Sequence, residues 1–242
     1  MRPPFAFAVL ALTLPLFCAA QDSSVIELKN EPHHHLVLQN NYVNVYSVQV
    51  APHDVVLLHK HEVNAIGITI NDAVITVASP GKPDSRQNVA SGQLRLQPAG
   101  YIHSTTVEGD NPFRNVTVEL LLPQQNFHNV CATVMSAQPL SCPHLAAPGS
   151  EEVAFESDKT KVATIRLVPA QSVTVDHAGS PALIVALDDG TTSNAAADGD
   201  ARLDKGHTMW GDAGAAPQVL TNHGAKAVRL VIFTFKPESA GK

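Results

Sequence analysis

Hydrophobic and polar residues alternate in short runs from Val25 onward. The stretch 42–48 alternates strictly, and the stretch 65–77 does so more loosely. A period of two residues is typical of a strand with one buried face, and no long stretch has the period of an amphipathic helix. The pattern predicts an all-β protein, either a barrel or a sandwich. Further short apolar runs, separated by turn residues, cover 94–97, 116–122, 162–168, 182–187 and 228–235.

A repeat in spacing divides these strands into two halves. A shift of 117 residues lays Pro52 on Pro169 and continues through the following turn. Beyond that turn we expect a shift of 107, which lays Gly92 on Gly199. The repeat predicts two tandem β units joined by a linker, over residues 25–126, 127–149 and 150–237.

The first 20 residues have the pattern of a secretory signal peptide. Arg2 gives a positive start, an apolar run of 13 residues extends to Phe17, and small residues precede a cut after Ala20. A lipid anchor on Cys18 is the alternative, although the residue before a lipidated cysteine is normally small. The run is too short to span a bilayer comfortably. We therefore expect residues 1–20 to be removed and the protein to be secreted or periplasmic.

Two cysteines, Cys131 and Cys142, remain after that cut. An exported chain meets an oxidising compartment, where an even cysteine count favours pairing. A bridge would close a loop of 12 residues, and the loop-entropy model gives it about 3 kcal/mol of stabilisation. Two independent buried thiols are the alternative, and the spacing excludes a CxxC zinc or redox site.

Composition adds one question to this picture. The net charge is −6, from 16 basic and 22 acidic residues, and such mild acidity argues against nucleic acid or an anionic membrane as the main partner. Histidine is unusually frequent, with 12 copies, 7 of them between residues 33 and 103. Because imidazole is the commonest side-chain ligand of transition metals, the count raises the question of a metal site.

Three of the histidines have the spacing of such a site. His59 and His61 are separated by one residue, so on a strand both imidazoles point to the same face. His103 follows a glycine, a strand and a Pro-x-Gly turn, which can return it across a barrel. Three neutral imidazoles on one wall can hold Fe, Mn, Ni, Cu or Zn and leave positions open for water or substrate.

At these residues the chain resembles the cupin superfamily. The segment from Gly92 to His103 matches the second cupin motif, G-x5-P-x-G-x2-H, and His59-Lys60-His61 matches the HxH of the first. The resemblance implies two tandem jelly-roll-like β-barrels, as in bicupins. It also implies that His59, His61 and His103 bind one divalent transition metal ion, with iron first and Mn, Ni, Cu or Zn as alternatives.

The first motif departs from the family pattern. His53 replaces its leading glycine, Ala65 its glutamate and Asp72 its second glycine. Glu62 and Asn64 have the opposite parity to the histidines, so they should point out of the barrel unless a bulge re-aims one. The resemblance then implies a three-histidine site without a carboxylate, as in thiol and diketone dioxygenases. A degenerate barrel with merely hydrogen-bonded histidines is the alternative.

In the second half, the ligand positions fall on Asp176, Ala178 and Trp210. We therefore expect no second metal site, and we expect this half to pack against the first, bury its sheet edge and close one face.

Three further features are less specific. Tyr101 is the candidate catalytic residue, a proton donor facing the cavity, with a packed tyrosine as the alternative. Arg95 could reach an anionic substrate, but we expect an exposed strand arginine. The cluster His33-His34-His35 is expected to be a solvated strand start, because adjacent strand residues alternate faces.

Two functions remain open. The first is an exported metal-dependent oxidoreductase of the dioxygenase type that acts on a small molecule. The second is a non-catalytic periplasmic cupin that binds a small molecule or a sugar, because fold does not fix function. Neither function calls for nucleic acid or, after signal cleavage, a membrane, and a homo-oligomer stays open.

Overall fold

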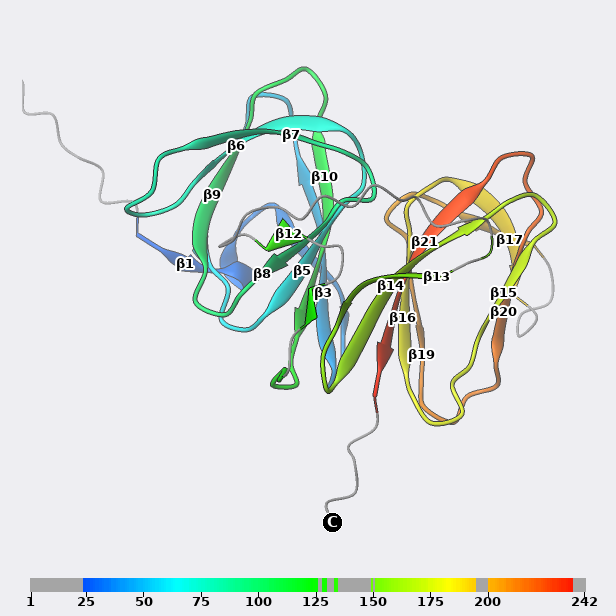
Figure 1. The fold of residues 1–242 in the computed structure, drawn as a ribbon. Helices are drawn as coiled ribbons and strands as arrows, with labels where there is room; N and C mark the ends of the chain where they lie inside the picture. The colour runs from blue at the N-terminus through cyan, green and yellow to red at the C-terminus, as the bar shows by residue number, and fades with distance from the viewer. Residues whose placement is uncertain are drawn as a thin grey trace, which may run out of the picture.

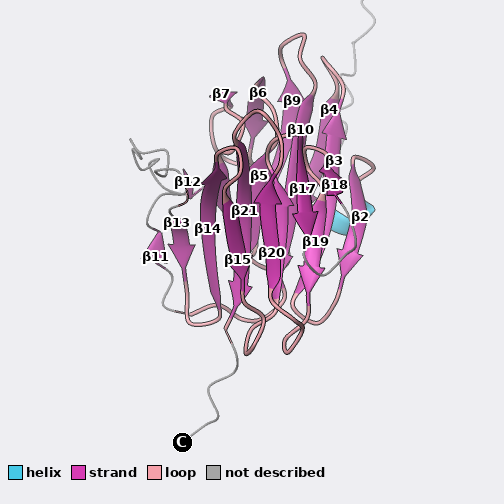
Figure 2. Ribbon diagram, turned by 90° about the vertical axis from the view of Figure 1, so that its right-hand side faces the viewer, coloured by secondary structure: helices cyan, strands magenta, loops and turns pink. Residues whose placement is uncertain are grey.

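A computed structural model of the chain describes residues 24–125, 128–129, 133–134, 149, 151–194 and 200–236. Within this part nearly every regular element is a strand, and the only helical turn is the 3-10 segment η1, Leu28–Asn30 (Figure 2). No helix among the described residues is long and apolar enough to cross a membrane. The predicted signal peptide and both Cys131 and Cys142 lie outside the described residues.

The first half folds into two facing sheets (Figure 1). Alternating apolar residues drive both, since each strand buries one face or two. The first sheet has the order β1 (Ile26–Glu27), β4 (Val55–Lys60), β9 (Ile102–Val107), β6 (Ala73–Ala78), β7 (Ser85–Val89). The second has the order β12 (Thr133–Val134), β8 (Leu94–Gln97), β5 (Ala65–Thr69), β10 (Phe113–Leu120), β3 (Val43–Val50), β2 (His34–Gln39).

The second half repeats this plan and lies beside the first (Figure 1). Its larger sheet has the order β11 (His128–Asn129), β13 (Glu151–Glu156), β14 (Thr160–Leu167), β21 (Val228–Phe235), β16 (Ala182–Ala186), β19 (Thr208–Gly211). Its smaller sheet has the order β15 (Ser172–Val175), β20 (Gln218–Asn222), β17 (Gly190–Asn194), β18 (Asp200–Leu203). The predicted all-β architecture of two tandem barrels is confirmed.

The two larger sheets pack against each other through one apolar layer. Along β10, Val116, Val118 and Leu120 belong to this layer, and they meet residues such as Leu183 and Phe233 of the second half. All five are at most 2% exposed. The second half therefore covers one outer face of the first barrel, as the sequence predicted. Because this outer face supplies apolar burial, the inner face of the same sheet can carry polar residues.

The repeat continues through both halves, but its later offset differs from the predicted one. Gly92 and Gly206 both have positive φ, 89° and 84°, and each donates its amide to the equivalent strand, at Thr69 and Ala186. Their numbers differ by 114, so the predicted pairing of Gly92 with Gly199 was wrong. The residues missing from the second half fall in the hairpin that corresponds to β6–β7. They are fewer than the predicted shift of 107 required.

Candidate metal centre

The three predicted ligands meet inside the first barrel. β4 carries His59 opposite His103 on β9, and a bulge between Val56 and His59 locally shifts the register. His61 follows directly after β4, and its backbone amide bonds the Tyr101 carbonyl. One ring nitrogen from each of His59, His61 and His103 lies within 4.8 Å of the other two. Strand pairing therefore joins His59 and His103, 44 positions apart in the sequence.

The nitrogen atoms are arranged as metal ligands would be. The Nε2 atoms of His61 and His103 are 3.1 Å apart, close to the ~3.0 Å expected between neighbouring ligands at metal–nitrogen distances of about 2.1 Å. His59 donates from Nδ1 to the Leu57 carbonyl, 2.8 Å away, because a carbonyl only accepts. Its Nε2 is left with the lone pair and has no hydrogen-bond partner.

Burial keeps all three imidazoles neutral. His59, His61 and His103 are 1%, 0% and 6% exposed. Burial lowers the pKa of His59 to about 4 and that of His61 to about 3. Burial, with the neighbouring histidines, also lowers the pKa of His103 well below its ordinary value. Neutral imidazole is the form that binds metal, so the donor set suits a transition-metal ion.

Among the described residues, no carboxylate joins the three imidazoles. Ala65 is fully buried at the family's glutamate position. Glu62 is exposed and pairs with Lys60 at 3.0 Å, while the Asn64 side chain accepts from the Ala99 amide at 2.9 Å. The parity prediction for these two residues is confirmed. Beside Ala65 in the register lies Glu119, a buried carboxylate that sequence reasoning missed and that belongs to another hydrogen-bond group.

A fourth histidine lies next to the cluster, contrary to expectation. The His34 ring centroid is 5.0 Å from that of His59, and its side chain is only 5% exposed. Of the expected surface cluster, only His35 is fully exposed. The strand start turns inward because the buried Glu31, 1% exposed, hydrogen-bonds the two imidazoles that follow it, with His34 Nδ1 at 2.6 Å and His33 Nδ1 at 3.0 Å.

Glu31 also connects this strand start to the metal centre. Glu31 accepts a hydrogen bond from the Leu57 amide at 3.1 Å. The Leu57 carbonyl in turn accepts a hydrogen bond from Nδ1–H of His59. Burial alone would raise the pKa of Glu31, but the bonds from His34, His33 and Leu57 lower it to about 2. In the sequence, the only signal for this hydrogen-bonded group was the run Glu31-Pro32-His33-His34. Its role could not be inferred without the contact between Glu31 and Leu57, 26 residues further on.

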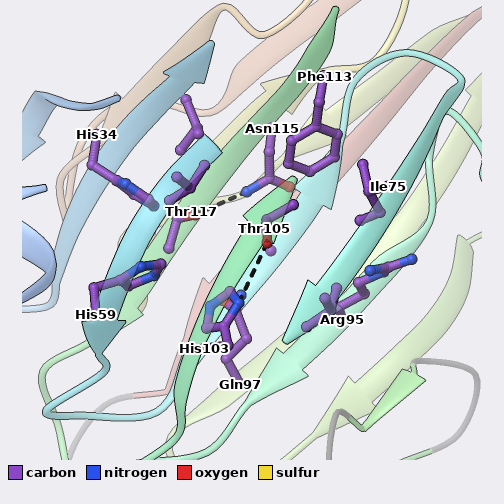
Figure 3. Close-up of a pocket in the computed structure, with 14 residues that line it drawn as sticks. His34, His59, Ile75, Arg95, Gln97, His103, Thr105, Phe113, Asn115 and Thr117 are labelled. Atoms are coloured by element: carbon purple, nitrogen blue, oxygen red, sulfur yellow. Dashed lines mark hydrogen bonds between the residues drawn. The ribbon is translucent and has the colours of Figure 1, made fainter. Parts of the chain in front are cut away.

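A small cavity opens beside the histidines (Figure 3). The volume of this cavity is about 40 Å³. Arg95 and Gln97 of β8 line it, so the expectation of an exposed Arg95 was wrong: the strand's other face, with Leu94 and Leu96, is needed for the layer between the barrels. The remaining polar lining residues are His34, His59, His103, Thr105, Asn115 and Thr117.

Solved structures identify the architecture. AerE from Microcystis aeruginosa is 9% identical over 85% of this chain and 98% of its own, with a TM-score of 0.53. Salicylate 1,2-dioxygenase from Pseudoaminobacter salicylatoxidans is 12% identical over 80% of this chain and 68% of its own, with a TM-score of 0.54. A cupin 2 conserved barrel domain protein from Leptotrichia buccalis is 13% identical over 84% and 88%, with a TM-score of 0.51. This chain has the cupin fold.

No family model and no curated protein matches the sequence. At identities this low, the solved structures establish the cupin fold alone, so the activity has to be inferred from the residues of the site.

In this barrel, Tyr101 packs against the histidine cluster instead of lining the cavity. Its ring stacks on that of His103, with centroids 4.7 Å apart, and on that of His61 at 6.2 Å. Its hydroxyl lies 3.4 Å from Ser79 Oγ. The geometry favours the packed alternative over the predicted proton donor, because Tyr101 is not among the residues that line the cavity.

The second cupin barrel forms no three-ligand cluster among its described residues. The counterpart of His103 is Gln218, which pairs with Val175 as His103 pairs with His59. The expected counterpart Trp210 instead packs in the layer between the barrels. This correction follows from the strand register, which lays His103 on Gln218 at an offset of 115.

In the second barrel, the residue equivalent to His61 is His177, whereas the sequence predicted Ala178. The carbonyls of His61 and His177 each accept the amide of a positive-φ glycine, Gly100 and Gly214. His177 is 1% exposed and neither ring nitrogen has a partner. Its imidazole therefore has no companion ligands among the described residues.

Proposed function

We propose that this cupin binds one divalent transition metal ion, iron first, through His59, His61 and His103. We further propose that the loaded protein is an oxidoreductase of the dioxygenase type acting on a small molecule. The observation that carries the proposal is a cluster of three neutral imidazoles, two of which line a cavity with polar and apolar walls.

The donor set fits such an ion. His59 Nε2 is buried with no hydrogen-bond partner among the described residues, and a buried polar atom without a partner is costly unless a ligand satisfies it. A bound iron ion would supply redox chemistry with dioxygen. A site with only three neutral protein ligands keeps the charge of the ion uncompensated and leaves positions open. The shared fold with salicylate 1,2-dioxygenase supports this reaction class.

The chain's own residues would orient the ligands and exclude water. The Leu57 carbonyl fixes the tautomer of His59, and such outer contacts set ring orientation in metal sites. Tyr101 holds the faces of His61 and His103 by stacking. Val56, Ile75 and Val77 line the cavity beside the polar residues and make its other walls apolar.

The test is the metal content of the purified full-length protein after loading with iron(II). We expect about one equivalent in the wild type and less than about 0.2 in the double variant His59→Ala/His61→Ala, because removal of two ligands abolishes a three-ligand site. The control is His35→Ala/His53→Ala, which removes two exposed histidines and should retain the metal. Equal metal in both double variants would contradict the site.

The same samples distinguish the enzyme from the binding protein. Nitric oxide mimics dioxygen, and we expect the iron-loaded wild type to give a high-spin iron–nitrosyl spectrum by electron paramagnetic resonance. Full metal loading without that signal would contradict the dioxygenase class and favour the non-catalytic cupin that binds a small molecule or a sugar.

Export and the Cys131–Cys142 disulfide belong to the same proposal. They are supported by the signal-like sequence of residues 1–20 and by the even cysteine count that follows it. A secreted or periplasmic location would place the protein where the bridge can form.

A further inference from the structure

Arg95 is an unusual residue for the interior of a barrel. It is 7% exposed and lines the cavity (Figure 3). Its only hydrogen bond to a described residue runs from Nη2 to Gln93 Oε1, at 3.2 Å, and its Nε has no partner. Gln97, two residues along the same face of β8, has a buried Oε1 that also lacks a partner.

No acidic side chain compensates this guanidinium within the cavity. The lining residues include histidines, amides, threonines and apolar residues, but neither aspartate nor glutamate. Burial lowers the pKa of Arg95 to about 10, so the group stays charged at neutral pH. A buried charge with neither an ion-pair partner nor full hydrogen bonding is strongly unfavourable. Such an arrangement is expected where a ligand completes it.

The fold does not need an arginine at this position. In the second barrel the equivalent residue is Met209, which pairs with Ile184 as Arg95 pairs with Gly67. Gly67 places no side chain opposite Arg95, and a Cβ there would reach contact distance of the Asn115 and Gln97 side chains. The first barrel thus keeps both a charge and open space where the second is filled.

We propose that Arg95 binds the carboxylate of the substrate, which is a small carboxylic acid. The inference rests on the proposed function, because it places the rest of that molecule beside the three histidines. The planar fork of arginine matches a carboxylate with two parallel hydrogen bonds. The Gln97 amide can turn its N–H to the same group, and the small cavity excludes bulky anions. Arg95 is a specificity-determining residue and takes no part in proton transfer.

The test is calorimetric binding to the full-length protein loaded with manganese(II), which prevents turnover. The probes are two pairs of equal shape, propionate against propionamide and benzoate against benzamide. At least one carboxylate should bind at least tenfold more tightly than its amide, the range expected for charge-assisted bidentate bonds. Arg95→Gln should abolish that preference and Arg95→Lys should retain part of it. The matched control is Arg86→Gln, on an exposed residue of β7, which should change nothing.

The outcomes separate the subsite from the metal centre. Carboxylate preference that persists in Arg95→Gln, with metal still bound, would place the anion on the metal alone and overturn the role of Arg95. Equal affinity for acid and amide in the wild type would overturn the substrate class without need of any variant. Tighter binding of inorganic phosphate than of either acid would also overturn it. Failure of the wild type to hold manganese would instead contradict the proposed function.

Discussion

The two barrels share one backbone plan but have opposite interiors. In the first barrel, Gly67, Arg95, Asn115 and Thr117 face the cavity. The strand registers place Ile184, Met209, Leu230 and Ile232 at the same positions in the second barrel. All four lie in or against its apolar core.

This difference shows that one barrel of a two-barrel protein can supply stability while the other holds the groups that bind ligands. A cavity lined with polar groups forgoes apolar burial, which is the main favourable contribution to folding. Here the layer between the barrels and the filled second interior supply that burial instead. The first barrel can then hold uncompensated polar atoms, including those of His59 and Arg95.

The largest effect should come from making the second interior polar. Ile184 is 1% exposed, and Ile184→Asn should lower the free energy of unfolding by about 4 kcal/mol, from lost burial and an amide without partners. Urea denaturation followed by circular dichroism measures it. Ile184→Val is the control and should cost about 1 kcal/mol. A near-neutral asparagine would break the comparison, since the second interior would then tolerate polar groups as the first does.

The next effect tests the buried carboxylate of the first barrel. Glu31→Gln should lower the free energy of unfolding by roughly 3 kcal/mol at pH 7, because each unit of pKa difference corresponds to about 1.4 kcal/mol. The pKa of Glu31 is lowered from 4.5 to about 2 in the folded protein. Its contribution is therefore present above pH 4.5 and is lost as the pH falls toward 2.

Urea denaturation of both proteins at pH 7, 5 and 3 measures this prediction. The difference between wild type and variant should be present at pH 7 and at pH 5 and clearly smaller at pH 3. Glu62→Gln, at an exposed carboxylate paired with Lys60, serves as the control and should change stability by less than about 0.5 kcal/mol. A difference for Glu31→Gln that does not depend on pH would show that its charge is not what stabilises the strand start.

The smallest effect comes from making the first interior apolar. Thr117→Val removes the acceptor of the bond from Asn115 Nδ2, 2.8 Å long, and should cost about 1 kcal/mol, the usual net value of one hydrogen bond. The measurement is again the midpoint of urea denaturation. The control is Thr76→Val, at a half-buried position of β6 that alternates with the buried Ile75 and Val77. A loss comparable to that of Ile184→Asn would mean that the polar lining itself stabilises the first barrel.

Local sequence was enough to predict the strands and the histidine cluster. Alternation predicted the all-β fold, and the HxH and Pro-x-Gly spacings identified His59, His61 and His103, because strand parity and turn geometry act over a few residues. The same parity correctly turned Glu62 and Asn64 away from the cluster. It did not orient Arg95, because alternation does not say which of two buried faces looks into the cavity.

What only the tertiary structure decided depends on contacts between distant segments. The inward turn of His34 requires Glu31 to meet the Leu57 amide, 26 residues away. The true counterparts of the ligands, His177 and Gln218, follow from hydrogen-bond register, which weak sequence spacing could not determine. The apolar layer between the barrels decided that one face of β8 is covered, and that its other face carries Arg95 into the cavity.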